Sequence, residues 1–249
     1  MSEAIKDLLY RMADDELVLG HRNSEWTGLG PILEEDIAFS SIAQDQIGHA
    51  VANYQLLHEE FGESLPDAIA FSRGERQFHS SQFTELPIGD YAFSLIRHFL
   101  FDHAEMLRYE MLTVSSFAPL AALARKIKGE LKYHVLHADL WVSKLGQGTE
   151  ESRARMQTAL TEAWPYALGM FEPCDYEEVL VTNGVFSGED KLQVLWQETI
   201  VPIIERAGLV IPTAIEPKYG GRHGYHTEHL QPLLDEMTEV YRLDPAAIW

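Results

Sequence analysis

The chain has 249 residues, 46% of them hydrophobic, which suits one globular domain with a sizeable core. Its 39 acidic and 19 basic residues give a formal net charge of −20, which opposes binding to nucleic acid or to an anionic membrane. Cys174 is the only cysteine, so no disulfide can form within the chain, and neither a spanning apolar run nor a secretion signal is evident. These features predict a cytoplasmic protein that acts neither on nucleic acid nor in a membrane.

Helical periodicity dominates the chain, and clusters of glycine and proline separate four long helices. We expect these helices at about 2–23, 33–61, 90–117 and 119–145. A shorter helix near 67–80 would make the link between the second and third a long crossover, as in ferritin-like bundles. Residues 150–249 form a predicted helical extension, with helices at about 150–169, 175–182, 187–208 and 227–242. The sequence therefore predicts one all-α domain over residues 1–249, with a ferritin-like four-helix core.

Polar residues interrupt the apolar stripe of the first two long helices. Glu16 stands among aliphatic residues in the first helix, and Gln46 and His49 stand one turn apart in the second. Such groups cost several kcal/mol to bury without a partner, on the order of 2–7 kcal/mol each. We therefore expect them to share a partner inside the bundle.

The third and fourth helices place ionisable groups at the same level of the bundle. The third helix has two tenable inward faces, one with His98, Asp102 and Glu105, the other with His103. The fourth carries His134 on its apolar stripe, with Glu130 at the edge.

A di-iron carboxylate centre is one such shared partner, because two helices of the bundle then give a Glu each and two give Glu-x-x-His. Gln46-x-x-His49, 30 positions after Glu16, replaces one carboxylate by an amide, and Leu131-x-x-His134 lacks the other. A pair of irons favours anionic oxygen ligands, so we expect this chain to hold no metal cofactor. The positions of the degenerate metal site are Glu16, Asp45, Gln46, His49, Asp102, Glu105, Glu130, Leu131 and His134.

Several segments resemble one known family. Residues 17–26 read LVLGHRNSEW, residues 34–38 EEDIA and residues 43–50 AQDQIGHA; Tyr133-His134, GRHGYHTEHL at 221–230 and the closing Trp249 complete the pattern. On these segments the chain resembles the structural C subunits of multicomponent phenylacetyl-CoA epoxidases, nearly from end to end. The catalytic A subunits of that family have a long-spaced Glu and an Asp-Glu-x-x-His motif. Here Glu16, Asp45 and His49 match that motif, and Gln46 departs from it.

The resemblance implies a non-catalytic role in an oxygenase of aerobic phenylacetate degradation. Its implied partners are a homologous catalytic subunit that holds the di-iron centre, the other oxygenase components, and phenylacetyl-CoA as the substrate of the complex. On its own, the chain could form a homo-oligomer. In this interpretation no residue of the chain is catalytic.

Two interpretations of the polar cluster stay open from the sequence. In the first, Glu16, Asp45, Glu130, His49 and His134 form a hydrogen-bonded ion-pair network without metal, in which Asp45 orients an imidazole. In the second, the chain is itself an oxygen-activating di-iron enzyme, with metal ligands drawn from these same five residues. Glutamate at positions 46 and 131 would favour the enzyme, whereas Gln and Leu favour the network.

Two further expectations concern charge and association. Nearby carboxylates should raise the pKa of both His49 and His134 above the ordinary value of about 6.5. The third helix carries too many large apolar side chains for one four-helix seam, so we expect part of it to contact another subunit. These side chains are Phe93, Phe99, Phe101, Leu107 and Met111.

Overall fold

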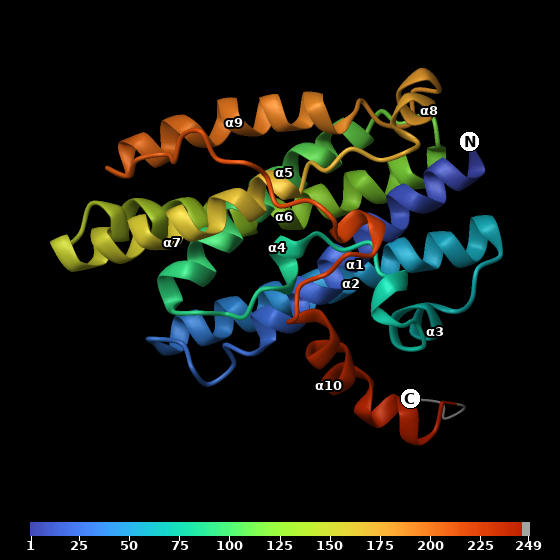
Figure 1. Ribbon diagram of the computed structural model, residues 1–249, viewed down its shortest axis with the longest axis horizontal. Coiled ribbons are helices and arrows are strands. Elements are labelled where there is room, and N and C mark those ends of the chain that lie inside the picture. Colours follow the sequence, from blue (N-terminus) through green and yellow to red (C-terminus); the bar gives the residue numbers. More distant parts are fainter. Residues whose placement is uncertain (246–249) are drawn as a thin grey trace.

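The computed structural model describes residues 1–245, and within that range every regular element is a helix (Figure 1). The long helices of the core are α1 (Ser2–Ser24), α2 (Leu33–Phe61), α5 (Tyr91–Leu112) and α6 (Ala118–Gly146). Three of the four agree closely with the predicted ranges, and the predicted all-α, ferritin-like class is confirmed. Trp249, one of the residues used for the resemblance, lies outside the described range.

The four-helix core consists of two helical hairpins, α1–α2 and α5–α6. The α1–α2 hairpin is tight because Gly20 has no side chain; an added Cβ would lie 3.0 Å from Ile47 of α2. Gly62 ends α2 in the left-handed conformation (φ 72°), and the Asp90 side chain caps the first turn of α5 by accepting from the Phe93 amide. Residues 62–90 connect the two hairpins, which gives the predicted long crossover.

The crossover and the end of the third helix differ from expectation. The helix predicted at 67–80 is instead the short helix α3 (Pro66–Phe71) and the 3-10 turn η1 (Glu75–Gln77), and α4 (Gln82–Glu85) follows. Helix α5 ends at Leu112 rather than near 117, because Ser116 turns away to donate to the Gly184 and Asn183 carbonyls.

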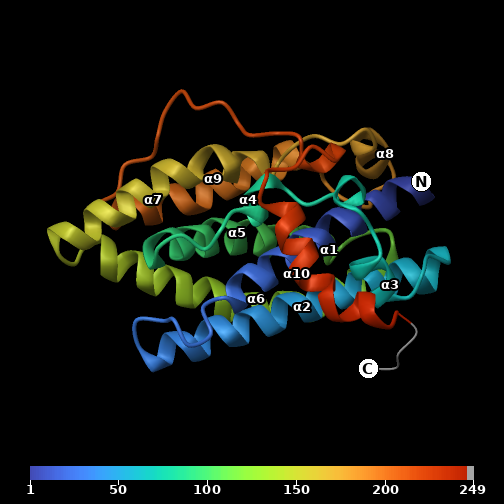
Figure 2. The ribbon, with the colours of Figure 1, turned by 60° about the horizontal axis from the view of Figure 1, so that its bottom comes forward.

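The C-terminal extension forms a second layer against α5. It contains α7 (Glu150–Gly169), α8 (Glu177–Thr182), α9 (Glu189–Arg206), the 3-10 turn η2 (Gly221–His223) and α10 (Leu230–Leu243). Figure 2 shows α7 and α9 on one side of α5, and α1 and α2 on the other. Trp196 of α9 is fully buried, stacks on Trp164 and donates to the Leu100 carbonyl at 2.9 Å.

This second layer covers much of the third helix, whose contact with another subunit stays a prediction. Phe99 and Phe101 are fully buried within the chain, and Phe93, Leu107 and Met111 pack against the same core. Helix α5 is therefore the central helix of this chain: it contacts α6, α7 and α9, and Phe93, Leu107 and Met111 stay partly exposed.

The connection from α9 to α10 is anchored by buried charges. Arg222 forms an ion pair with Asp15 of α1 at 2.7 Å, and Glu85 of α4 accepts from Thr227 and contacts the His226 ring. Helix α10 begins at Leu230, three residues later than predicted, and Thr227 makes only a long contact of 3.3 Å to the His229 amide. Figure 2 shows α10 crossing in front of α1.

Candidate functional site

The four helices of the core bring the predicted positions to one level of the bundle. Six of the nine side chains in question are almost completely buried, Leu131 is buried with them, and two lie at the outer edge. The buried polar ones are Glu16, Gln46, His49, Asp102, Glu105 and His134, and the half-exposed ones are Asp45 and Glu130. We call this group the histidine–carboxylate site.

His49 connects three helices. Its Nδ1 lies 3.3 Å from Glu16 Oε1 of α1, and its Nε2 lies 2.9 Å from Glu130 Oε2 of α6. Burial alone would lower the pKa of His49, but the charge and hydrogen bond of Glu16, together with Glu130, raise this pKa to about 9. The predicted direction is confirmed for this histidine.

Burial also shifts the pKa of Glu16. The side chain is fully buried, and this raises the pKa of Glu16 to about 7, against the opposing attraction of His49. Its second oxygen, Oε2, has no hydrogen-bond partner among the described residues. Glu16 and His49 thus form a buried pair that retains protons to unusually high pH.

His134 behaves in the opposite way, so the prediction for this residue was wrong. Its Nε2 lies 3.0 Å from Asp45 Oδ2, which is 44% exposed, while its Nδ1 has no partner in the described part of the chain. Burial lowers the pKa of His134; Asp102 opposes this effect, and repulsion from His98 and His49 adds to it. The exposed carboxylate does not compensate for burial as Glu16 does for His49.

The two positions that depart from the metal-binding template hold neutral groups in the core. Gln46 is fully buried and accepts a hydrogen bond from Asn23 Nδ2 at 2.8 Å. Leu131 is fully buried in the main hydrophobic cluster. Neither residue can supply the negative charge that a pair of irons requires.

The acids of α5 are paired with His98 and Arg108, which settles the register of the third helix. Asp102 contacts the His98 ring, and this contact holds the pKa of Asp102 below its usual value although burial opposes the effect. Glu105 accepts from Arg108 at 2.8 Å, and Arg108 also donates to Glu189 of α9 at 2.6 Å. His98, Asp102 and Glu105 therefore share the inward face, while His103 pairs with Asp139 at 2.8 Å.

A second chain of hydrogen bonds, not anticipated from the sequence, runs from α5 to the start of α2. His98 Nε2 lies 3.2 Å from His137 Nδ1, and His137 Nε2 lies 2.9 Å from Glu35 Oε2. Glu35 also accepts from Tyr91 and from Trp141. The only signal in the sequence was the position of His137 one turn from His134, because Glu35 lies in an acidic run typical of a helix start.

The arrangement does not fit a di-iron centre. In the described part of the chain, no group of three or more His, Cys, Asp or Glu side chains is placed to hold a metal ion. Asp45 and Glu130 each contact a histidine of the other helix, and the acids of α5 contact His98 and Arg108. Glu16, Asp45 and Glu130 each contact a ring nitrogen of His49 or His134 directly, and whether the site is free of metal stays a prediction.

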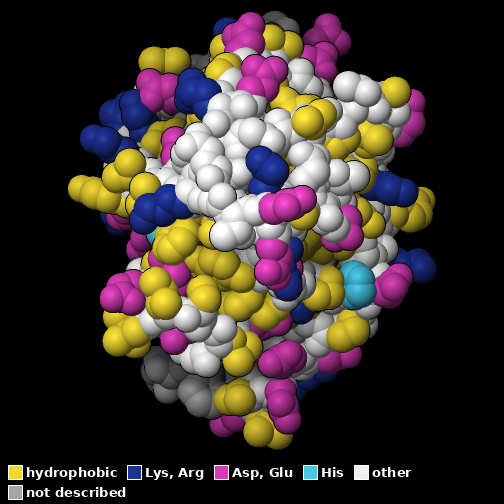
Figure 3. All heavy atoms as spheres, turned by 90° about the vertical axis from the view of Figure 1, so that its left-hand side faces the viewer, with side chains coloured by type: hydrophobic (Ala, Val, Ile, Leu, Met, Phe, Trp, Pro, Cys, Tyr) yellow, Lys and Arg dark blue, Asp and Glu magenta, His cyan; other side chains and the backbone are white. Residues whose placement is uncertain are grey.

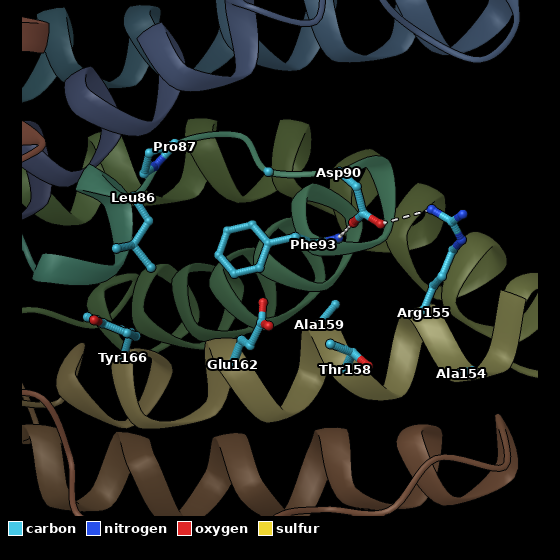
Figure 4. Close-up of a pocket in the computed structure, with 11 residues that line it drawn as sticks. Leu86, Pro87, Asp90, Phe93, Ala154, Arg155, Thr158, Ala159, Glu162 and Tyr166 are labelled. Atoms are coloured by element: carbon cyan, nitrogen blue, oxygen red, sulfur yellow. Dashed lines mark hydrogen bonds and ion pairs between the residues drawn. The ribbon is translucent and has the colours of Figure 1, made fainter. Parts of the chain in front are cut away.

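A separate groove of about 610 Å³ lies on the far side of α5. Figure 4 shows Phe93 in its centre, between the link that contains Leu86 and Pro87 and the side chains of α7. Asp90 and Arg155 form an ion pair of 3.5 Å across one end. Figure 3 shows one end of the molecule, where hydrophobic side chains lie among acidic and basic ones. No residue of the histidine–carboxylate site lines this groove.

Comparisons with known proteins show the family of the chain. No helix in residues 1–245 is long and apolar enough to cross a membrane. Over 239 residues the chain is 33% identical to the C subunit of 1,2-phenylacetyl-CoA epoxidase from Escherichia coli K12, covering 96% of both chains. It is 25% identical over 222 residues to the A subunit of the same epoxidase, covering 85% of this chain and 71% of its relative. A family model described as phenylacetic acid catabolic protein matches residues 1–249, and the chain belongs to this family.

Proposed function

We propose that this chain is the non-catalytic structural subunit of a cytoplasmic multicomponent phenylacetyl-CoA epoxidase, and that it pairs with a homologous catalytic subunit that carries the di-iron centre. The observation that carries the proposal is the pair of neutral residues in the core. Gln46 accepts from Asn23, and Leu131 packs in the hydrophobic cluster, where the template has two carboxylates. The similarity to the epoxidase C subunit over nearly the whole chain supports the same role.

In this role the histidine–carboxylate site replaces metal ligation as the tie between the core helices. His49 joins α1 to α6 through Glu16 and Glu130, and His134 joins α6 to α2 through Asp45. A bound proton on His49 supplies the positive charge that the buried carboxylate needs. The site thus stabilises a rigid bundle that can shape and support a catalytic neighbour.

The alternative, an oxygen-activating enzyme in its own right, needs Asp45, His49, Glu130 and His134 to converge on one metal centre. The two carboxylates instead lie at the outer edge of the bundle, 44% and 43% exposed. Each contacts a single histidine ring nitrogen. No observation favours the alternative over the structural role.

Reconstitution tests the proposal. The catalytic homologue and its reductase are assayed for epoxidation of phenylacetyl-CoA with and without this chain, and the iron content of this chain alone is measured by elemental analysis. We expect activity to depend on the chain, and its own iron to be far below one atom per chain. Full epoxidation without the chain, or two tightly bound irons in it, would contradict the proposal.

A further inference from the structure

Arg97 of α5 differs from the other buried arginines of the chain. It is fully buried, and in residues 1–245 no carboxylate forms an ion pair with it. Arg11, Arg108 and Arg222 are buried as well, and each forms an ion pair with a buried carboxylate. A buried charge is normally paired in this way, because burial removes it from water.

The surroundings of Arg97 do not neutralise its charge. Burial lowers the pKa of the Arg97 guanidinium to about 9, the positive charge of Arg22 lowers it further, and Glu25 opposes both effects. Glu25 is 37% exposed and already forms an ion pair with Arg22 at 2.8 Å. Arg97 therefore carries its proton at neutral pH, where an anion beside it would be stabilising.

The unpaired nitrogens of Arg97 are the two that suit a carboxylate. Its Nη1 donates to the backbone carbonyls of Leu86 and Pro87. Its Nε and Nη2 have no hydrogen-bond partner among the described residues. In a guanidinium these two nitrogens direct parallel N–H bonds to one side, and this fork matches the two oxygens of one carboxylate.

Arg97 lies against the groove of about 610 Å³ between α5 and α7. Leu86 and Pro87, whose carbonyls it contacts, both line the groove. The Cζ atom of Arg97 is 5.7 Å from the centre of the Phe93 ring, and Figure 4 shows this ring in the middle of the groove. Phe93 is therefore in contact with the buried guanidinium and with the groove.

The groove has the size and lining of a small-molecule site. Ligand pockets commonly have volumes of about 300–1,000 Å³ and mainly apolar walls with a few polar groups. Helix α7 contributes the small side chains of Thr158 and Ala159 opposite Phe93, and Tyr166 lies at the same end as Leu86 (Figure 4). Two aromatic rings in the lining favour a flat apolar body.

The charges around the groove favour a ligand with a single negative charge. Figure 4 shows Glu162 pointing from α7 toward Phe93, and the Asp90–Arg155 ion pair at the end away from Leu86. Together with the net charge of −20, Glu162 disfavours a phosphate or another multiply charged anion. A monocarboxylate attached to an aromatic ring suits both the apolar walls and the fork of Arg97.

The structure assigns the groove, together with Arg97, to the binding of a small aromatic monocarboxylate. Phe93 is only partly buried, so its ring can turn and open the groove to the guanidinium. The ring of the ligand lies beside Phe93 and Tyr166, and its carboxylate accepts hydrogen bonds from Nε and Nη2 of Arg97. This site is separate from the histidine–carboxylate site, and the inference goes beyond the proposed function and does not depend on it.

Calorimetric titration of the full chain tests the class of ligand. The probes are 3-phenylpropionate, its neutral amide and inorganic phosphate. We expect 3-phenylpropionate to bind with a dissociation constant below about 1 mM, and the amide at least about 10-fold more weakly, because it offers no charged pair of oxygens to the fork. Phosphate should show no saturable binding at about 10 mM. Amide or phosphate binding as tight as that of the carboxylate, or no carboxylate binding at about 10 mM, overturns the inference.

Three variants locate the bound carboxylate. Arg97→Lys keeps the charge and removes the fork, so it should weaken binding at least about 10-fold. The matched control, Arg155→Gln, removes the exposed cation at the other end of the groove and should change the affinity by less than about 3-fold. Thr158→Trp fills the groove from an exposed position of α7, so it should abolish binding and leave the melting temperature nearly unchanged.

Thr158→Trp and the amide keep the test decisive if Arg97→Lys does not fold, because neither alters the buried arginine. Circular dichroism and the melting temperature establish folding for each variant. Unchanged affinity in a folded Arg97→Lys or in Thr158→Trp overturns the inference. A loss of about 10-fold in Arg155→Gln also overturns it, because the carboxylate would then bind at the exposed end of the groove.

Discussion

His49 and His134 occupy equivalent places on α2 and α6, yet their protonation is shifted in opposite directions. Each contacts a half-exposed carboxylate of the other helix, at 2.9 Å for Glu130 and 3.0 Å for Asp45. They differ at the second ring nitrogen, where His49 faces the buried Glu16 and His134 has no partner among the described residues. The pKa of His49 is raised to about 9, and that of His134 is lowered.

The difference shows that a buried carboxylate raises the pKa of an imidazole far more than an exposed carboxylate at a similar distance does. Water screens the charge of Asp45 and Glu130, whereas Glu16 acts through the low-dielectric core. Burial of Glu16 raises its own pKa to about 7, so the pair exists because each partner compensates for the burial of the other. A metal ion would remove this asymmetry by serving both histidines.

The largest effect is expected when the residue one turn before each histidine is changed to glutamate. Without metal, Leu131→Glu should lower the free energy of unfolding by about 3 kcal/mol or more, because the carboxylate enters an aliphatic cluster. Gln46→Glu should cost less, because Asn23 already donates to this position. Urea denaturation of both single variants and the double variant measures the effects.

Addition of Fe(II) or Mn(II) to the double variant should recover much of this loss and raise its melting temperature, while the wild type stays unaffected. The exposed double variant E198K/E205K serves as a folding control. Equal losses in the free energy of unfolding for Gln46→Glu and Leu131→Glu would show that the hydrogen bond from Asn23 does not stabilise a carboxylate at position 46. A double variant indifferent to metal would show that the two new carboxylates do not converge.

The second prediction is a pH dependence of opposite sign on the two sides of the site. Because the folded pKa of His49 is raised, its contribution to stability is complete below the unfolded value of about 6.5 and is lost as pH rises through about 9. The free energy of unfolding should therefore fall by up to about 3 kcal/mol between pH 7 and pH 9.5. His134, with a lowered pKa, contributes above about 6.5 and loses its contribution in acid.

Histidine variants separate these two contributions. His49→Asn should abolish the decrease at alkaline pH, and His134→Asn should leave it intact and reduce the loss of stability below pH 6.5. Chemical denaturation at pH 5.5, 7.5 and 9.5 gives the comparison. A flat profile for the wild type between pH 7 and 9.5 would mean that Glu16 and His49 are not paired in solution.

The ends of most long helices follow from local sequence, and this is why they were predictable. Gly62, Asp90 and Pro119 act on their own backbone neighbourhood, so the ranges of α2 and α6 agree closely with expectation. The cover of α5 depends on packing between residues far apart in the chain, such as Trp196 against Trp164. Periodicity could show that α5 is apolar on several sides, but not which element covers it.

The candidate site shows the same limit. Helical spacing correctly placed Glu16, Gln46, His49 and His134 inside the bundle. It could not tell which carboxylates stay in solvent, because exposure depends on small rotations of α2 and α6, and this caused the error for His134. The Arg108–Glu189 pair was equally hidden, since it joins α5 to a helix of the second layer.

The third prediction converts His49 into a histidine like His134. Glu16→Gln keeps the shape of the side chain and removes its charge, so the pKa of His49 should fall from about 9 to about 6.5 or lower. The pKa of His134 should move little. NMR titration of the imidazole resonances measures both, with the exposed Glu3→Gln as control. A value above 8 for His49 in the variant would assign its shift to Glu130 instead.

The smallest effects are expected for the two half-exposed carboxylates at the outer edge of the bundle. Their size tests whether these carboxylates contribute to the difference between His49 and His134. Asp45 and Glu130 are 44% and 43% exposed, so each pair should contribute less than about 1 kcal/mol. Asp45→Asn and Glu130→Gln should each lower the pKa of the histidine it contacts by a fraction of a unit, with the effect reduced in 0.5 M salt because solvent ions reach these groups. Thermal denaturation and the same NMR titration provide the test. A loss above 2 kcal/mol for Glu130→Gln alone would show that this carboxylate is shielded from solvent in solution. Equal small losses at both positions would leave burial of Glu16 as the source of the asymmetry.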